Sequence, residues 1–197
     1  TITAKTLTLS SIADKVYDGS SKASFSQGVL NGLVGSEVLD ISGSGSYADK
    51  NAGVGKAFTV NAATLADAGS GASAGLASNY VLATPSGVTG TVSKASINGV
   101  TGIVAQTRAY DGTADATLDT GSAAYTGMVN GDSLTFSAAT AVFNDKNAGS
   151  KTVSVTGIVL GGADAGNYTL GNATASGSGT ITAKTLTLSS IADKVYD

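Results

Sequence analysis

The chain repeats itself, and the length of the repeat limits what it can fold into. Tyr-Asp-Gly begins at Tyr17 and again at Tyr110, and Tyr-Asp returns at Tyr196, which gives spacings of 93 and 86 residues. Residues 1–18 also recur unchanged as residues 180–197. A self-similar period of this length predicts that each repeat is one small domain with its own core.

Two further blocks mark the same period. Asp-Lys-Asn-Ala-Gly begins at Asp49 and at Asp145, and Asn-Tyr-x-Leu begins at Asn79 and at Asn167. The interval between these two blocks shortens from 30 residues in the first repeat to 22 in the second. Most of the difference lies in residues 66–78, a segment rich in Ala, Gly and Ser that predicts an enlarged surface loop.

The repeats define the expected domains. They are one β unit at 5–93, a second at 94–183, and the first strand of a third, truncated unit at 184–197. The alternation of apolar residues changes phase at Lys5, and Lys94 and Lys184 occupy the equivalent junctions. We therefore expect very short linkers, which favour a stiff rod over a flexible string, and contacts between neighbouring repeats near these lysines.

Composition removes several classes of function. The chain has no cysteine, histidine or tryptophan, one Glu (Glu37), one Arg (Arg108) and a net charge of −3. Disulfides, thiol chemistry and histidine-based acid–base or zinc sites are excluded. The charge provides no basic footprint for nucleic acid, and no apolar run is long enough to span a membrane. We expect no enzyme, no cofactor, no nucleic-acid partner and no membrane insertion.

Short strands account for most of each unit. Residues 6–12 alternate with period 2, which is typical of a strand with one buried face, and 38–47 and 134–142 predict longer strands. The other predicted strands are the hairpin returns 56–60 and 151–155, the short pieces 79–82 and 167–170, and the closing strands 88–92 and 178–181. About six or seven strands per unit predict an all-β fold of tandem, Ig-like β-sandwich repeats. A parallel β-helix would instead need self-similarity every ~20–30 residues.

The repeated polar motifs are interpreted as structural turns. We expect the Asp of Tyr-Asp-Gly to accept backbone N–H groups and the glycines of the motifs to take a positive φ. Each Tyr is expected to pack over the end of the sandwich with its hydroxyl bonded to backbone; the alternative is an exposed ring that stacks on sugars. The predicted motif residues are Tyr17, Asp18, Gly19, Asp49, Asn51, Gly53, Asn79, Tyr80, Tyr110, Asp111, Gly112, Asp145, Asn147, Gly149, Asn167 and Tyr168.

Other interpretations of the polar residues are weaker. Asp-Lys-Asn offers oxygens at alternate positions, but calcium needs about six to eight oxygen ligands and neither block has a second acid, so we expect no metal. A Lys–Asn isopeptide cross-link would need both side chains buried beside an acid, whereas we expect these blocks to be exposed turns, so no cross-link is expected. Asp111, Asp115 and Asp119 are interpreted as separate solvated acids and not as a catalytic pair. The many Ser and Thr residues reflect β-propensity better than an ice- or polysaccharide-facing array.

Three blocks in one order carry a family resemblance: Lys-Val-Tyr-Asp-Gly, Asp-Lys-Asn-Ala-Gly and Asn-Tyr-x-Leu. Together they resemble the YDG-type repeats, often found with mostly-β glycine-rich repeats, of very large bacterial exoproteins similar to filamentous-haemagglutinin-type or biofilm adhesins. The resemblance covers essentially the whole chain. It implies an extracellular fibre anchored at the cell surface, typically of a Gram-negative bacterium, and carries neither a known ligand nor catalytic residues.

The expected function is therefore structural. The repeats would form the stalk of a secreted cell-surface adhesin, extend a distal binding domain, and contact mainly the neighbouring repeats of the same chain. The alternative is that each repeat binds a polysaccharide or a host or matrix surface weakly and that the array supplies avidity. That alternative predicts an exposed aromatic patch shared by successive units.

Overall fold

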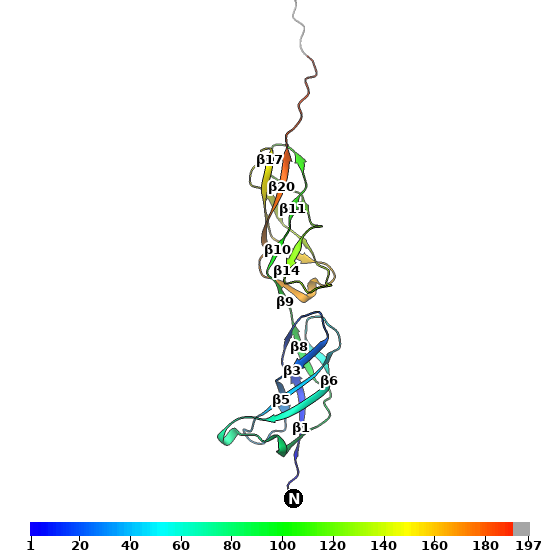
Figure 1. Ribbon diagram of the computed structural model, residues 1–197, viewed down its shortest axis with the longest axis vertical. Coiled ribbons are helices and arrows are strands. Elements are labelled where there is room, and N and C mark those ends of the chain that lie inside the picture. Colours follow the sequence, from blue (N-terminus) through cyan, green and yellow to red (C-terminus); the bar gives the residue numbers. More distant parts are fainter. Residues whose placement is uncertain (191–197) are drawn as a thin grey trace, which may run out of the picture. The chain divides into compact units, whose positions relative to one another are not determined.

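The computed structural model describes residues 1–190 of the 197-residue chain. The described part is all-β: its strands are joined by loops and by three short 3₁₀ turns (Figure 1). No helix within it is long and apolar enough to cross a membrane.

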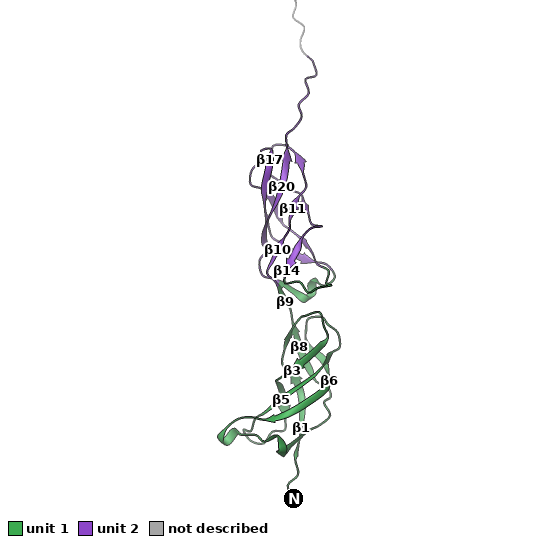
Figure 2. Cartoon of the chain, in the orientation of Figure 1, with its two compact units in different colours: residues 1–96, 127–133, 163–169 green, residues 97–126, 134–162, 170–197 purple. Residues whose placement is uncertain are grey.

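The chain divides into two compact units (Figure 2). The first unit comprises residues 1–96 together with two loops from later in the chain, 127–133 and 163–169. The second comprises 97–126, 134–162 and, among the described residues, 170–190. The first unit therefore includes residues that belong to the second sequence repeat.

The first unit contains an eight-stranded sheet with the order β3-β5-β6-β8-β1-β4, in which β2 also pairs with β8 and β7 with β1. Its strands are β1 (Lys5–Ile12), β2 (Lys15–Val16), β3 (Lys22–Phe25), β4 (Gly28–Asn31), β5 (Leu39–Tyr47), β6 (Gly53–Asp67), β7 (Tyr80–Leu82) and β8 (Thr89–Ser93). The predicted strand at 6–12 is found as β1. Its alternation buries Leu7 and Leu9, while Thr6, Thr8 and Ser10 are exposed.

The first Asp-Lys-Asn-Ala-Gly block turns the chain from β5 into β6, as the sequence predicts. The two strands run antiparallel, with Tyr47 opposite Phe58 next to the turn. The predicted surface loop at 66–78 begins later than expected, because β6 continues to Asp67 in pairing with β5. The remainder of that loop contains the 3₁₀ turns η1 (Gly71–Ser73) and η2 (Ala77–Asn79).

Two glycines of β5 let aromatic rings approach the backbone closely. A Cβ atom on Gly45 would lie 2.6 Å from Phe58 Cε1, and one on Gly43 would lie 2.5 Å from Phe25 Cζ. The rings of Phe25 and Phe58 pack edge to face with their centroids 5.9 Å apart. Close approach of these rings to the backbone explains why glycine stands inside a strand.

The second unit contains the sheet β13-β11-β20-β17-β16, in which β12 also pairs with β20, and the strand pairs β10–β14 and β15–β18; β9 pairs with β19. Its strands are β10 (Gly99–Thr101), β11 (Val104–Ala105), β12 (Arg108–Ala109), β13 (Leu118–Asp119), β14 (Ala124–Thr126), β15 (Thr135–Ser137), β16 (Thr140–Phe143), β17 (Gly149–Thr156), β18 (Val159–Gly161) and β20 (Thr174–Thr182). Of β9 (Ala95–Ile97) and β19 (Tyr168–Leu170), the first two residues of each belong to the first unit. The third 3₁₀ turn, η3 (Ala165–Asn167), precedes β19.

The single long strand predicted at 134–142 is wrong. The structure has two strands there, β15 paired with β18 and β16 paired with β17. Phe136 and Phe143 are both buried, although residues seven positions apart face opposite sides of a regular strand. The break at Ala139, whose N–H bonds to Thr156 and Gly157, lets both rings face the core.

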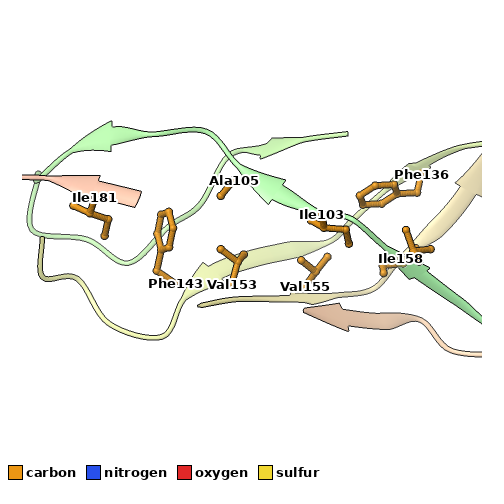
Figure 3. Packing of buried hydrophobic residues seen from close by; sticks show 9 residues of the cluster. Ile103, Ala105, Phe136, Phe143, Val153, Val155, Ile158 and Ile181 are labelled. Atoms are coloured by element: carbon orange, nitrogen blue, oxygen red, sulfur yellow. The ribbon is translucent and has the colours of Figure 1, made fainter. Parts of the chain in front are cut away.

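The core of the second unit is formed by branched aliphatic side chains and two phenylalanines (Figure 3). Val153 and Val155 of β17 are fully buried and belong to the same cluster as Ile103, Phe143 and Ile181. The burial of alternate residues of β17 matches the hairpin return predicted at 151–155.

The third unit expected from the sequence begins at residue 184. Residues 184–190 form no strand, and the remainder of that prediction, 191–197, lies outside the described residues. Leu186 and Leu188 are 87% and 80% exposed, whereas Leu7 and Leu9, in the identical sequence of β1, are buried. In β1, Leu9 pairs with Leu30 of β4 and Leu7 with Leu82 of β7.

Candidate functional site

A cluster of polar side chains forms inside the first compact unit from residues far apart in the sequence. We call it the polar cluster; its members are Tyr17, Lys50, Asn51, Asp132, Asp164, Asn167 and Tyr168. The first three come from residues 1–96 and the others from the loops 127–133 and 163–169, all within the first unit. Four of the seven are predicted motif residues.

Asp132 is the centre of the cluster, and its side chain is only 3% exposed. Its Oδ2 atom accepts hydrogen bonds from the hydroxyls of Tyr17 at 2.8 Å and Tyr168 at 2.6 Å. Its Oδ1 atom accepts one from the Lys50 ammonium at 2.9 Å. Because the acceptor is a charged carboxylate, each of these three hydrogen bonds is stronger than one between neutral groups.

Asp164 and Asn167 add further hydrogen bonds to the cluster. The Lys50 ammonium also reaches Asp164 Oδ1 at 3.3 Å, and Asp164 Oδ2 accepts the N–H of Ser133. Asn167 is 5% exposed; its Oδ1 accepts the N–H of Ala52 at 2.9 Å, and its Nδ2 donates to Asn51 Oδ1 at 3.2 Å. Asp164 thus bonds to both Lys50 and Ser133, and Asn167 bonds to residues 51–52.

The tyrosine rings pack against each other. The rings of Tyr17 and Tyr168 meet edge to face with centroids 5.5 Å apart, and the Lys50 ammonium lies 5.9 Å from the centroid of the Tyr17 ring. Tyr168 Oη also accepts the N–H of Val129. The expectation that the Tyr17 hydroxyl bonds to backbone is wrong: its partner is a carboxylate. With 3% of its surface exposed, Tyr17 also has no free face for a sugar.

The cluster changes the pKa values of its members. Burial and the hydrogen bond to Asp132 raise the pKa of Tyr168 to about 12. Burial alone would raise the pKa of Asp132, but the hydrogen bonds from Tyr168, Lys50 and Tyr17 outweigh it and lower that pKa. Hydrogen bonds to Asp132, Tyr17 and Asp164 raise the pKa of Lys50. At neutral pH the cluster therefore contains a charged lysine, a charged Asp132 and neutral tyrosines.

The Tyr-Asp-Gly turns are built alike in both repeats. Asp18 accepts the N–H of Ser20 at 2.9 Å, and Gly19 has a φ of +79°. Asp111 accepts both the N–H and the hydroxyl of Thr113 at 2.9 Å, and the following Gly112 has a φ of +89°. The hydrogen bonds from Thr113, aided by Arg108, lower the pKa of Asp111 to about 2.

The Asp-Lys-Asn-Ala-Gly turns are closed by a later lysine. Asp49 accepts the N–H of Asn51 and pairs with Lys56; Asp145 accepts the N–H of Asn147 and pairs with Lys151. Each carboxylate is therefore held by its own turn. Residues 1–190 contain no group of three or more His, Cys, Asp or Glu side chains that could hold a metal ion.

The two glycines that end these blocks differ. Gly149 has a φ of +134°, as the sequence predicts, but the prediction of a positive φ at Gly53 is wrong. Gly53 already pairs with Val92 as the first residue of β6, and the register shifts before Lys56. The positive φ in this segment, +63°, falls on Gly55.

The first repeat contains a related tyrosine–acid pair. Tyr80 donates to Glu37 Oε2 and accepts the N–H of Val34 at 3.1 Å. These contacts match those that Tyr168 makes with Asp132 and Val129. In the sequence, Gly32 and Gly127 begin equivalent segments of the form Gly-x-Val-x-x-acid.

Sequence reasoning found the tyrosines of the cluster but missed its charged members. Aligning the two Gly-x-Val-x-x-acid segments would have indicated Glu37 and Asp132. Asp164 gives no such signal, because Leu76 stands at its position in the first repeat. Of the other predicted residues, Tyr110 packs against the core of the second unit, and Tyr196 lies outside the described residues.

The strand pairing and the repeated tyrosine–acid contacts define an all-β protein made of a repeated domain. The family model of the YDG domain matches residues 3–87 and, in tandem, residues 93–177. The chain belongs to the YDG domain family. No curated protein and no solved structure is significantly similar to it.

Proposed function

We propose that this chain is part of the stalk of a secreted adhesin on the surface of a bacterium, typically Gram-negative, of the filamentous-haemagglutinin-like kind. Its YDG domains would be Ig-like β-sandwiches joined by very short linkers, and would extend a distal binding domain. The fold proposal is supported by the β15–β18 pair and the β17 sheet, which both contribute side chains to one core.

One observation carries the proposal. The polar cluster joins motif residues of the first YDG match, among them Tyr17 and Lys50, to Asp132 and Tyr168 of the second match. Repeated residues that bind ligands would be expected to face solvent. In the polar cluster they instead form hydrogen bonds with other members of the cluster. Every buried side-chain nitrogen and oxygen of residues 1–190 has a hydrogen-bond partner. Motifs used in this way suit a chain whose role is to hold its repeats together.

The burial of the motif tyrosines disfavours the alternative of distributed adhesion. Tyr17, Tyr80 and Tyr168 are each at most 7% exposed, so three of the repeated rings are unavailable for stacking on sugars. A weakly binding repeat would need an exposed aromatic or polar platform on successive units.

Binding measurements test the proposal. The 197-residue chain and a concatemer with three times as many repeats are titrated with a panel of bacterial and host polysaccharides and matrix proteins. We expect no binding by either protein. Weak binding by the short chain that becomes much tighter for the concatemer would overturn the stalk in favour of adhesion by the repeats, because avidity grows with the number of linked sites.

A further inference from the structure

The tyrosine–acid pair of the first repeat borders a hollow: Tyr80 is buried, but Glu37 is half-buried, whereas Asp132 in the polar cluster is only 3% exposed. Val34, Glu37, Asn79 and Tyr80 line a hollow of about 490 Å³ in the first unit, together with residues 2–5 and Ser78. Glu37 accepts from Tyr80, which leaves its carboxylate with capacity for further donors. We call these four residues the acidic socket.

Residues of the acidic socket are more exposed than their equivalents in the polar cluster. Val34 is 50% exposed and Asn79 is exposed, whereas the equivalent Asn167 is buried and the equivalent Val129 half-buried. In the polar cluster Gly19 lies over Val129: a Cβ atom on Gly19 would lie 2.8 Å from Val129 Cγ1. Tyr17, Lys50, Asn51 and Ala52 supply the remaining cover there.

The second repeat carries the complementary residues in an open state. Tyr110, Lys146, Asn147 and Ala148 correspond to Tyr17, Lys50, Asn51 and Ala52. Lys146, Asn147 and Ala148 are exposed, and Tyr110 is half-buried where Tyr17 is buried. Among the contacts between described residues, neither the Tyr110 hydroxyl nor the Lys146 ammonium makes a hydrogen bond. We call these four residues the tyrosine–lysine knob.

We propose that the knob of one copy of this chain docks into the acidic socket of the next copy, in the way that Tyr17 and Lys50 contact Asp132 and Tyr168. Residues 180–197 repeat residues 1–18 without change. A second copy that begins after residue 179 therefore leaves the sequence of residues 180–197 unaltered. Glu37 then accepts from Tyr110 and Lys146 of the preceding copy, and Asn79 bonds to its Asn147 and Ala148. This inference deepens the proposed stalk and rests on it for its biological meaning.

The new contact is weaker than the polar cluster. Leu76 occupies the position of Asp164, so Lys146 gains one carboxylate where Lys50 has two. An array of such copies would therefore alternate a stronger with a weaker contact. Force or heat would open the knob–socket contact first.

Cysteine cross-linking tests the contact. The chain contains no cysteine. In a fusion of residues 1–179 to a second full chain, Ala148→Cys is placed in the first copy and Asn79→Cys in the second, because the equivalent pair is joined by a 2.9 Å bond from Ala52 N to Asn167 Oδ1. Both positions are exposed, so the fold is not at risk. We expect a disulfide within the fusion under mild oxidation.

Two control fusions decide the result. Moving the second cysteine to the exposed Thr59 of β6 should slow cross-linking at least tenfold, as should adding Tyr110→Phe and Lys146→Met in the first copy. Absence of the Ala148–Asn79 disulfide, or equal rates in all three fusions, overturns the docking proposal. Neither result bears on polysaccharide binding, so failure here is distinguishable from failure of the stalk.

Discussion

The Tyr17 hydroxyl donates a 2.8 Å hydrogen bond to Asp132 Oδ2 across 115 residues of sequence. Tyr17 belongs to the Tyr-Asp-Gly motif of the first YDG match, and Asp132 belongs to the second match. The motif thus forms a local turn through Asp18 while its tyrosine makes a long-range contact. The same three residues serve both local folding and the joining of repeats.

Replacing the central carboxylate should destabilise the first unit. In Asp132→Asn, the Tyr17 and Tyr168 hydroxyls lose a charged acceptor and Lys50 loses its closer partner. Because Lys50 is 41% exposed, solvent recovers part of the loss, and we expect the free energy of unfolding to fall by about 1–3 kcal/mol. Urea denaturation measures it. The exposed Asp40→Asn is the control; equal effects of the two substitutions would contradict a special role for Asp132.

The two equivalent tyrosines should respond differently to loss of the hydroxyl. Tyr17→Phe removes a buried hydrogen bond and should cost about 1 kcal/mol of unfolding free energy. Tyr110→Phe should change it by less than about 0.5 kcal/mol, since that hydroxyl makes no hydrogen bond within the described residues. The same denaturation experiment compares both variants with the wild-type chain. A larger effect at Tyr110 would show that its hydroxyl has a partner.

The fold could be predicted where local patterns decide it. Alternation predicts β1, and the Asp-Lys-Asn-Ala-Gly blocks predict the β5–β6 and β16–β17 hairpins, because turn residues and period 2 are local properties. The division of 134–142 into β15 and β16 was not predictable in this way. It depends on Phe136 and Phe143 both reaching the core, which only tertiary packing determines.

The candidate site could be predicted only in part. Repetition identifies Tyr17 and Tyr168 as important, but their common acceptor Asp132 lies 115 and 36 residues away from them. No short-range pattern encodes such a contact. Lys50 lies within a repeated block, yet its contacts with Asp132 and Asp164 become apparent only when the chain is folded.

A methyl group at Gly45 should disrupt the packing of β5. It would lie 2.1 Å from the backbone oxygen of Thr59 and 2.6 Å from Phe58 Cε1, so the sheet or the ring must move. We expect Gly45→Ala to lower the free energy of unfolding by roughly 1–3 kcal/mol, the usual cost of overpacking. Gly99→Ala is the control, because nothing lies within 4 Å of a Cβ there and its φ is not positive. Equal melting temperatures for the two variants would contradict the packing described.

Stability should fall at both ends of the pH scale, for different reasons. The lowered pKa of Asp132 stabilises the folded chain above the carboxyl's unfolded value of about 4, and this stability is lost as acid protonates the folded group. The raised pKa of Tyr168 stabilises the folded chain below the phenol's unfolded value of about 10, and this stability is lost between there and the folded value of about 12. Urea denaturation at each pH should therefore give a plateau from about pH 5 to 9. Asp132→Asn should flatten the acid limb and Tyr168→Phe the alkaline limb; an acid limb unchanged in Asp132→Asn would assign it to other carboxylates.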